Sequence, residues 1–210
     1  MKAPTPEPWY FRSLHYGYSP PNATVVLWWR VAHDATLHIQ HEWRAQQLTI
    51  ADLAAAMRKE TLDLGIEKVR HTAAHDENIG TEGKDGESRA ETFAKHKVPL
   101  RILTIDPVQG WTRVRELLGT RPDGRPWLTI HPTCQHLIRA IGSAVQDPSD
   151  AETIQDFGNI HPLNALRIGA MSRPAPNPQQ QPEMPKTAVG YLVNQLRAAA
   201  GATSQSLRWR

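Results

Sequence analysis

The chain has very little cysteine and no long apolar run. Cys134 is the single cysteine among 210 residues, so no disulfide can form within the chain. A lone thiol of this kind is typical of a reducing compartment, where it packs as a small apolar side chain. No apolar stretch approaches the ~20 residues of a membrane span, and the N-terminus MKAPTPEPWYF has no apolar signal region. We therefore expect a cytoplasmic protein without a membrane partner.

Motifs for nucleotide and zinc binding are also missing. The sequence contains no G-x-x-x-x-G-K-[ST] phosphate loop, which excludes an ATP-driven motor within this chain. The histidines of WRVAHD and HIQHE lack the second ligand pair that a closed tetrahedral zinc site requires. The sequence therefore indicates a globular protein that is neither an ATP-driven motor nor a protein built around a closed zinc site.

The positive net charge of +3 is unevenly distributed. Residues 1–170 carry 19 Lys and Arg against 20 Asp and Glu, whereas residues 171–210 carry five against Glu183 alone. All ten histidines lie in the first 170 residues. A nearly neutral body is compatible with a nuclease, because an acidic pocket and a basic track cancel in the sum.

Composition divides the chain into a body and a tail. With 40% hydrophobic residues, one core is expected over residues 9–172, after a leader at 1–8. Five prolines in RPAPNPQQQPEMPK predict an extended linker at 173–186. Residues 187–210 follow as a basic, amphipathic tail.

Periodicity and turn signals predict a mixed α/β domain. Three strands come first, then a helix, and strands alternate with helices from there on, which favours a mixed sheet. The stretch 75–87 is polar and rich in glycine, and is predicted to be a loop. The predicted strands are 9–16, 24–32, 35–43, 66–74, 98–104 and 126–131, and the helices begin near Thr49, Ser88, Asp106, Thr133 and His161.

Two of these helices are expected to be amphipathic. Their inward-facing residues are predicted to be Ile50, Leu53, Met57 and Leu64 in the first, and Val108, Trp111, Val114 and Leu118 in the second. Trp111 is therefore expected in the core rather than as a platform for stacking bases.

Five segments in order resemble the nuclease domain of the large subunit of tailed-phage terminases. They are RSLHYGYSPP with VVLWW, GESRAETFAKHKVPL, QGWTRVRELL, PWLTIHPTCQHLIRAI and HPLNALRIGAMSRP, and together they cover about residues 9–174. The resemblance implies an RNase H-like fold of β-β-β-α-β-α-β order and two-metal cleavage of concatemeric double-stranded phage DNA with Mg²⁺ or Mn²⁺. It also implies phage or prophage origin, and partnership with a portal protein and a packaging ATPase or small terminase subunit.

The chain departs from this family at the expected metal ligands. His15 stands where an aspartate is typical, and Asn164 replaces the second aspartate of an Asp-His-x-x-Asp-Ala-Leu-Arg pattern that begins here at Ile160. The middle acid corresponds either to His75 or to Asp76. At most one of the usual positions keeps its carboxylate.

Two hypotheses follow. In the first, the chain is a metal-dependent endonuclease with Asp76 as the surviving ligand and His15 and Asn164 as altered metal-binding and catalytic positions. In the second, it is an inactive terminase-derived fragment that keeps a DNA-binding or portal-docking role. Two Mg²⁺ ions ~3.5–4 Å apart need several carboxylates, whereas imidazole suits Mn²⁺ or Zn²⁺ better. His15 also has a simpler interpretation, as a hydrogen-bonded residue at a strand end.

Basic residues near the proposed site are candidates for DNA contacts. Lys84 and Arg89 flank the loop that carries Asp76, and Arg113 and Arg115 point away from the apolar face of their helix. Arginines in such positions bind phosphates in some proteins, although solvent-facing arginines are the commoner case.

Overall fold

The body of the chain folds as one unit that ends at Arg173. The predicted linker and tail beyond it lie outside the described residues, as does most of the leader. No helix in the described ranges is both long and apolar enough to cross a bilayer. The computed structural model describes residues 7–18, 22–79, 86–145, 154 and 160–173.

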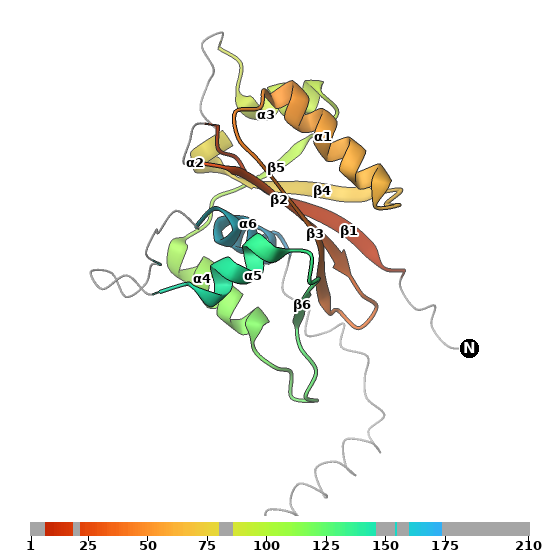
Figure 1. Cartoon of the computed structure of the whole chain (residues 1–210), viewed down its shortest axis with the longest axis vertical. Coiled ribbons are helices and arrows are strands. Elements are labelled where there is room, and N and C mark those ends of the chain that lie inside the picture. The colour runs from red at the N-terminus through yellow and green to blue at the C-terminus, as the bar shows by residue number, and fades with distance from the viewer. Residues whose placement is uncertain (1–6, 19–21, 80–85, 146–153, 155–159, 174–210) are drawn as a thin grey trace, which may run out of the picture. The chain divides into compact units, whose positions relative to one another are not determined.

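A six-stranded mixed sheet runs through the body (Figure 1). The strand order is β5-β4-β1-β2-β3-β6. The β1–β2 and β2–β3 pairs are antiparallel, and the β1–β4, β4–β5 and β3–β6 pairs are parallel. This arrangement confirms the predicted α/β class with a mixed sheet. The strands are β1 (Trp9–His15), β2 (Thr24–Val31), β3 (Leu37–Ala45), β4 (Val69–His75), β5 (Leu100–Leu103) and β6 (Leu128–Ile130).

Helices cover both faces of the sheet, α1 and α3 on one and α4, α5 and α6 on the other (Figure 1). The sequence explains where several begin: Thr49 caps α1, Ser88 and Glu91 form a capping box on α3, and Asp106 caps α4. The helices are α1 (Ile50–Asp63), α2 (Asp76–Ile79), α3 (Arg89–Lys95), α4 (Pro107–Leu118), α5 (Gln135–Gly142) and α6 (Ile160–Ser172). The single turn α2 lies where only a loop was expected.

Two apolar cores form because successive side chains of a strand point to opposite faces. In β2, Leu27 and Trp29 pack toward α4, α5 and α6, whereas Val26 and Trp28 pack toward α1 and α3. Cys134 is fully buried, and burial raises the pKa of its thiol to about 12, as fits an apolar packing role.

Two predicted helix faces need correction. Leu64, Val108 and Leu118 were expected to face inward, but they are 38%, 39% and 47% exposed. In α4 the buried position is Leu117, which belongs to the same core as Trp111 and Val114, whereas Leu118 lies at the edge of that core. Leu64 lies beyond the last turn of α1, where the helix no longer covers the sheet. Trp111 itself is buried, as predicted.

A buried polar cluster joins α1 to the sheet. The hydroxyl of Thr61 accepts hydrogen bonds from Trp28 Nε1 at 2.9 Å and from Arg12 Nη1 at 3.2 Å. Arg12 also donates to Thr72, and burial lowers its pKa to about 10. These neutral acceptors satisfy donors that would otherwise be buried without a partner.

Helix α6 approaches the sheet very closely at Gly169. A Cβ placed there would lie 2.2 Å from the nearest Trp29 ring atom, so only glycine fits without a shift. Trp29 is in turn fixed by a 2.9 Å hydrogen bond from its Nε1 to the Ser13 hydroxyl on β1. These contacts set the distance between α6 and β1.

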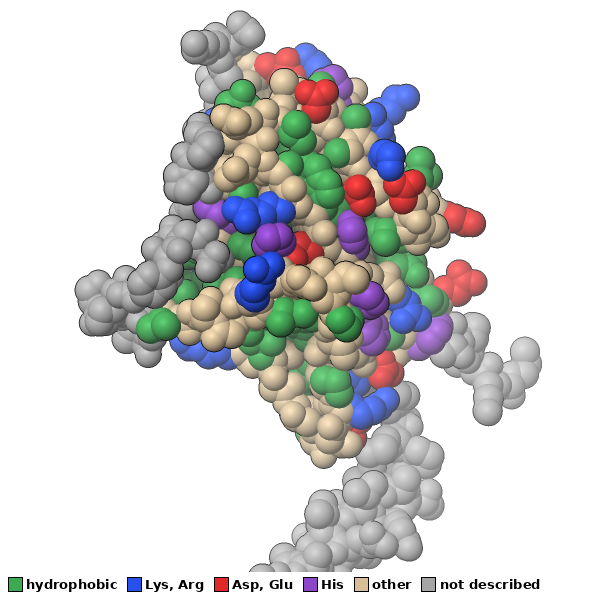
Figure 2. All heavy atoms as spheres, in the orientation of Figure 1, with side chains coloured by type: hydrophobic (Ala, Val, Ile, Leu, Met, Phe, Trp, Pro, Cys, Tyr) green, Lys and Arg blue, Asp and Glu red, His purple; other side chains and the backbone are tan. Residues whose placement is uncertain are grey.

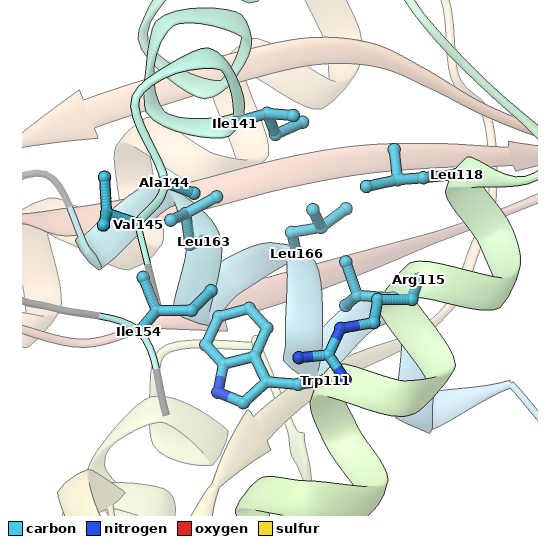
Figure 3. Close-up of a pocket in the computed structure, with 10 residues that line it drawn as sticks. Trp111, Arg115, Leu118, Ile141, Ala144, Val145, Ile154, Leu163 and Leu166 are labelled. Carbon is cyan, nitrogen blue, oxygen red and sulfur yellow. The ribbon is translucent and has the colours of Figure 1, made fainter. Parts of the chain in front are cut away.

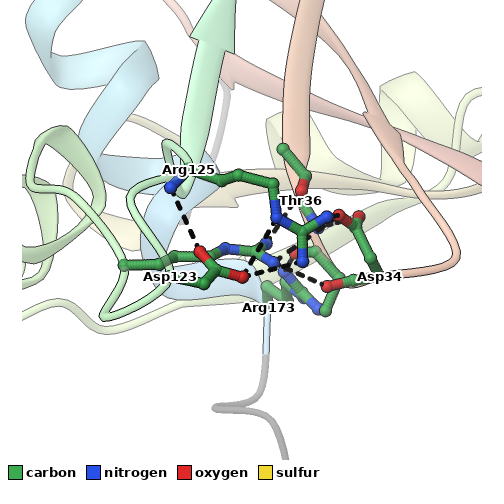
Figure 4. Close-up of polar contacts among 7 residues, drawn as sticks. Asp34, Thr36, Asp123, Arg125 and Arg173 are labelled. Carbon is green, nitrogen blue, oxygen red and sulfur yellow. Dashed lines mark hydrogen bonds and ion pairs between the residues drawn. The ribbon is translucent and has the colours of Figure 1, made fainter. Parts of the chain in front are cut away.

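A polar network holds the far end of α6 against the β2–β3 turn (Figure 4). Arg173, just after α6, donates to the carbonyl of Ala35 at 2.8 Å. Arg125 forms ion pairs with Asp34 at 2.9 Å and with Asp123 at 2.8 Å. The Arg173 hydrogen bond and the close approach at Gly169 thus hold the C-terminal half of α6 in place, and its first turn lies toward the opposite end of the strands.

Candidate functional site at the carboxyl ends of β1 and β4

Two neighbouring parallel strands bring polar side chains to one edge of the sheet. The register pairs Leu14 with Ala74, so His15 and His75 end β1 and β4 side by side. Because Leu14 and Ala74 both pack toward α1, the following side chains point toward α6. The carboxyl ends of parallel strands are where α/β folds commonly bind ligands.

His15 and His161 form a buried pair between β1 and α6. His15 Nε2 and His161 Nδ1 lie 3.1 Å apart, and the two rings are stacked with centroids 5.1 Å apart. The two residues are only 8% and 4% exposed. The pKa of His15 is lowered to about 3, chiefly because burial disfavours its charged form. Electrostatic repulsion from His161, Arg167 and His75 lowers it further. His15 is therefore uncharged near neutral pH.

Asp76 is fixed at the same edge by two side chains. Its Oδ1 lies 3.0 Å from His75 Nδ1, and its Oδ2 accepts a 2.7 Å hydrogen bond from the Thr104 hydroxyl. The other ring nitrogen of His75 lies 3.3 Å from the Ile105 carbonyl oxygen. Both nitrogens of His75 are thus engaged, and Asp76 presents a carboxylate that is partly open to solvent.

The described residues at this edge do not by themselves fit a pair of Mg²⁺ ions. Mg²⁺ prefers oxygen ligands, but His15 and His161 offer nitrogens that are hydrogen-bonded to each other. The nearby guanidinium of Arg167 adds positive charge, as its effect on His15 shows. Within the described ranges, no three His, Cys, Asp or Glu side chains are grouped so that they could hold a metal ion.

Two of the three ligands predicted from the sequence lie at this edge of the sheet in the structure. His15 and Asp76 both lie there, and α6 carries the third, Asn164, one turn after His161. On α6 it is His161 that contacts His15. The pair joins residues 146 positions apart in the sequence, and the motif pattern drew attention to the acid positions around His161 rather than to His161 itself.

The four predicted DNA-contacting residues lie in different surroundings. Arg89 begins α3, and its guanidinium carbon lies 5.4 Å from the centroid of Tyr16, the residue after His15. Arg113 is paired with Glu116 at 2.7 Å, and Arg115 lines an apolar cavity on α4. Lys84 lies outside the described residues.

Sheet order and helix layers together define an α/β fold of the RNase H-like kind. The fold is similar to that of large terminases of tailed phages. The large terminase of a thermophilic bacteriophage, in complex with ATP-gamma-S, matches with a TM-score of 0.60 at 17% identity, over 80% of this chain and 41% of the terminase. The P22 large terminase nuclease domain matches with a TM-score of 0.60 at 16% identity, over 82% and 84% of the two chains.

A third similar structure is the nuclease domain of the large terminase of bacteriophage SPP1, with bound Mn. It matches with a TM-score of 0.53 at 12% identity, over 80% of this chain and 88% of that domain. The chain thus spans about two fifths of the thermophilic phage terminase and most of the two isolated nuclease domains. No protein-family model and no curated protein matches the sequence. The expected terminase nuclease-like fold is confirmed.

Proposed function

We propose that this chain binds double-stranded DNA through a terminase-type nuclease fold and does not cleave it by two-metal hydrolysis. The observation that carries the proposal is the buried His15–His161 pair, which joins β1 to α6 and in which burial holds the pKa of His15 at about 3. Likeness to the P22 nuclease domain supports DNA as the partner.

The electrostatics of the edge support binding without cleavage. Two-metal hydrolysis holds two dications ~3.5–4 Å apart, which requires several negative ligands to offset their repulsion. Among the described residues, Asp76 supplies a carboxylate that contacts His75, while His15 is uncharged near neutral pH and is influenced by the charge of Arg167. On the face drawn in Figure 2, Lys and Arg side chains lie close to a histidine and an acidic side chain near the centre, in the region of α5. Arg and Lys side chains are among the groups that contact the phosphate oxygens of DNA.

Arg89 offers a direct test of DNA binding at this edge. In Arg89→Ala, we expect weaker binding of a fluorescent duplex by anisotropy and a salt slope lower by about 0.9 for a lost phosphate contact. Arg70→Ala is the matched control, since Arg70 also lies over an aromatic ring, that of Trp9, but at the opposite end of the strands. Equal loss in both variants would contradict binding at the His15 edge.

A supercoiled-plasmid assay tests the absence of cleavage. We expect no nicking with Mg²⁺, Mn²⁺ or chelator. Metal-dependent nicking that disappears in Asp76→Ala would instead establish the second candidate, a metal-dependent endonuclease. The fixed carboxylate of Asp76 favours that candidate, with His15 and Asn164 as altered ligands, and Mn²⁺ tolerates imidazole better than Mg²⁺ does.

The proposed setting is phage genome packaging in the bacterial cytoplasm. A portal protein and a packaging ATPase or small terminase subunit are the partners that this setting implies. The predicted linker at 173–186 and basic tail at 187–210 would contribute to binding the portal or DNA. Deleting residues 175–210 should weaken DNA binding in a salt-dependent way while leaving the circular dichroism of the body unchanged. Loss of folding in this variant would show that the tail belongs to the core.

A further inference from the structure

An apolar cavity opens among α4, α5 and α6, on the side of the sheet away from α1. Its volume is about 220 Å³. Figure 3 shows Trp111 and Leu118 of α4 facing Leu163 and Leu166 of α6, with Ile141 and Val145 at the α5 side. Two lining residues, Leu118 and Val145, are 47% and 50% exposed, so the cavity continues into an apolar surface.

One positive charge lies at the edge of this cavity. Arg115 lines it from α4 and is exposed (Figure 3). Arg113 on the same helix is neutralised by Glu116 at 2.7 Å, whereas Arg115 has no ion-pair partner among the residues that the structure describes. Within the described part of the chain, the surface therefore combines an apolar hollow with a cation that forms no ion pair.

The size of the cavity limits what it can hold. Sites for cofactors and drug-sized molecules are usually about 300–1,000 Å³, which is larger than this one. An apolar cavity of ~150 Å³ holds a benzene-sized ring. A volume of about 220 Å³ therefore suits one large apolar side chain rather than a whole cofactor.

We propose that this cavity is a docking site for an amphipathic helix of a partner protein. One aromatic or large aliphatic side chain of the partner fills the hollow, and an acidic side chain about one turn away pairs with Arg115. Helices commonly dock into grooves through such anchors, and a central anchor in a desolvated pocket carries most of the binding energy. The chain's own residues 187–210 contain no Asp or Glu, so they lack the acid that Arg115 requires.

Designed helical peptides test the proposal without knowledge of the partner. The probes are fluorescent Ala/Gln peptides of about 18 residues, long enough to form helix, with a central Phe and a Glu four residues later. Replacing Phe by Ala should weaken binding about 10- to 100-fold, because burying an aromatic side chain contributes ~1.5–3 kcal/mol. Replacing Glu by Lys should weaken it about 2- to 5-fold, as for one exposed ion pair.

Variants of the full chain make the test specific. Ala144→Phe should fill the exposed mouth of the cavity and abolish binding of the Phe peptide, and Leu62→Phe on α1 is its control. Arg115→Glu should bind the Lys peptide better than the Glu peptide, a reversal that Lys68→Glu should not produce. This reversal would remain informative even if Ala144→Phe folded poorly.

Three outcomes would overturn the proposal. The first is equal binding of the Phe and Ala peptides to the wild-type chain. The second is tighter peptide binding after deletion of residues 175–210, which would make the chain's own tail the occupant. The third is a wild-type dimer in sedimentation that Ala144→Phe converts to monomer, which would make a second copy the occupant.

Discussion

Placing carboxylates at positions 15 and 164 should make the thermal stability of the domain depend on bound divalent metal. His15→Asp places a carboxylate where β1 faces His161, and Asn164→Asp adds another on α6, with Asp76 already at the edge. Without metal, the double variant loses the imidazole hydrogen bond, worth about 1 kcal/mol, and gains carboxylates that repel each other. We expect it to be less stable than the wild type in chelator.

The size of the rescue follows from mass action. A metal present at about 100 times its dissociation constant stabilises the native state by about 2.7 kcal/mol. For a domain of this length, each 1 kcal/mol raises Tm by about 2–4 °C, so Mg²⁺ or Mn²⁺ should raise Tm by about 5–10 °C. Each single variant should show much less, because the two ions share one ligand set. Nuclease activity should rise with the metal affinity.

Thermal denaturation in Mg²⁺, Mn²⁺ or chelator measures this directly. The wild type should shift by less than about 1 °C, as should His33→Asp, a control at the exposed β2–β3 turn. A double variant that keeps the wild-type circular dichroism but gains no metal-dependent shift would refute the reasoning. The loss would then extend beyond His15 and Asn164, with Ile160, the first position of the motif, the next residue to change.

Three further predictions concern packing, pH and the buried polar cluster. Gly169→Ala should lower the free energy of unfolding by about 1–3 kcal/mol in urea titrations because its Cβ meets Trp29, whereas Gly142→Ala, with open space around it, should be neutral or stabilising. Because the pKa of His15 falls to about 3 in the native state, the unfolded state binds more protons between about pH 6.5 and 3. Stability should therefore fall by ~1.4 kcal/mol per pH unit as pH drops through this window, and His15→Gln should remove that contribution. Thr61→Val should lower the free energy of unfolding by about 2–3 kcal/mol in the same urea titrations, because Arg12 and Trp28 both lose the hydroxyl as an acceptor. A change below about 0.5 kcal/mol would show that these two donors find other acceptors.

Sequence patterns predicted the fold well because its signals are local. Alternation in β2, the cap at Thr49 and the capping box at Ser88 each specify an element from neighbouring residues alone. The short helix α2 was missed because a single turn carries no periodic signal. The choice between Leu117 and Leu118 as the buried residue depends on how α4 meets α6, which no pattern within α4 contains.

The candidate site was only partly predictable, because part of it depends on contacts between elements that are distant in the sequence. His15 and Asp76 follow predicted strands, so their meeting at one edge follows from a parallel pairing of β1 and β4. The contact between His15 and His161 depends on how α6 lies across the sheet. That position is set by Gly169, far along the helix from the site.

The same anchoring explains why the position of α6 does not depend on the side chains at His15 and His161. Helix α6 is held by the close approach at Gly169 and by the hydrogen bond of Arg173 to the β2–β3 turn, neither of which involves the site. The first turn of α6 therefore lies next to the end of β1 independently of the side chains that make this contact. In a carboxylate site those side chains repel until a cation is bound, whereas His15 and His161 are hydrogen-bonded to each other directly. Under the proposed function, this direct contact would hold β1 and α6 together without a cation between them and would leave the edge free to bind DNA.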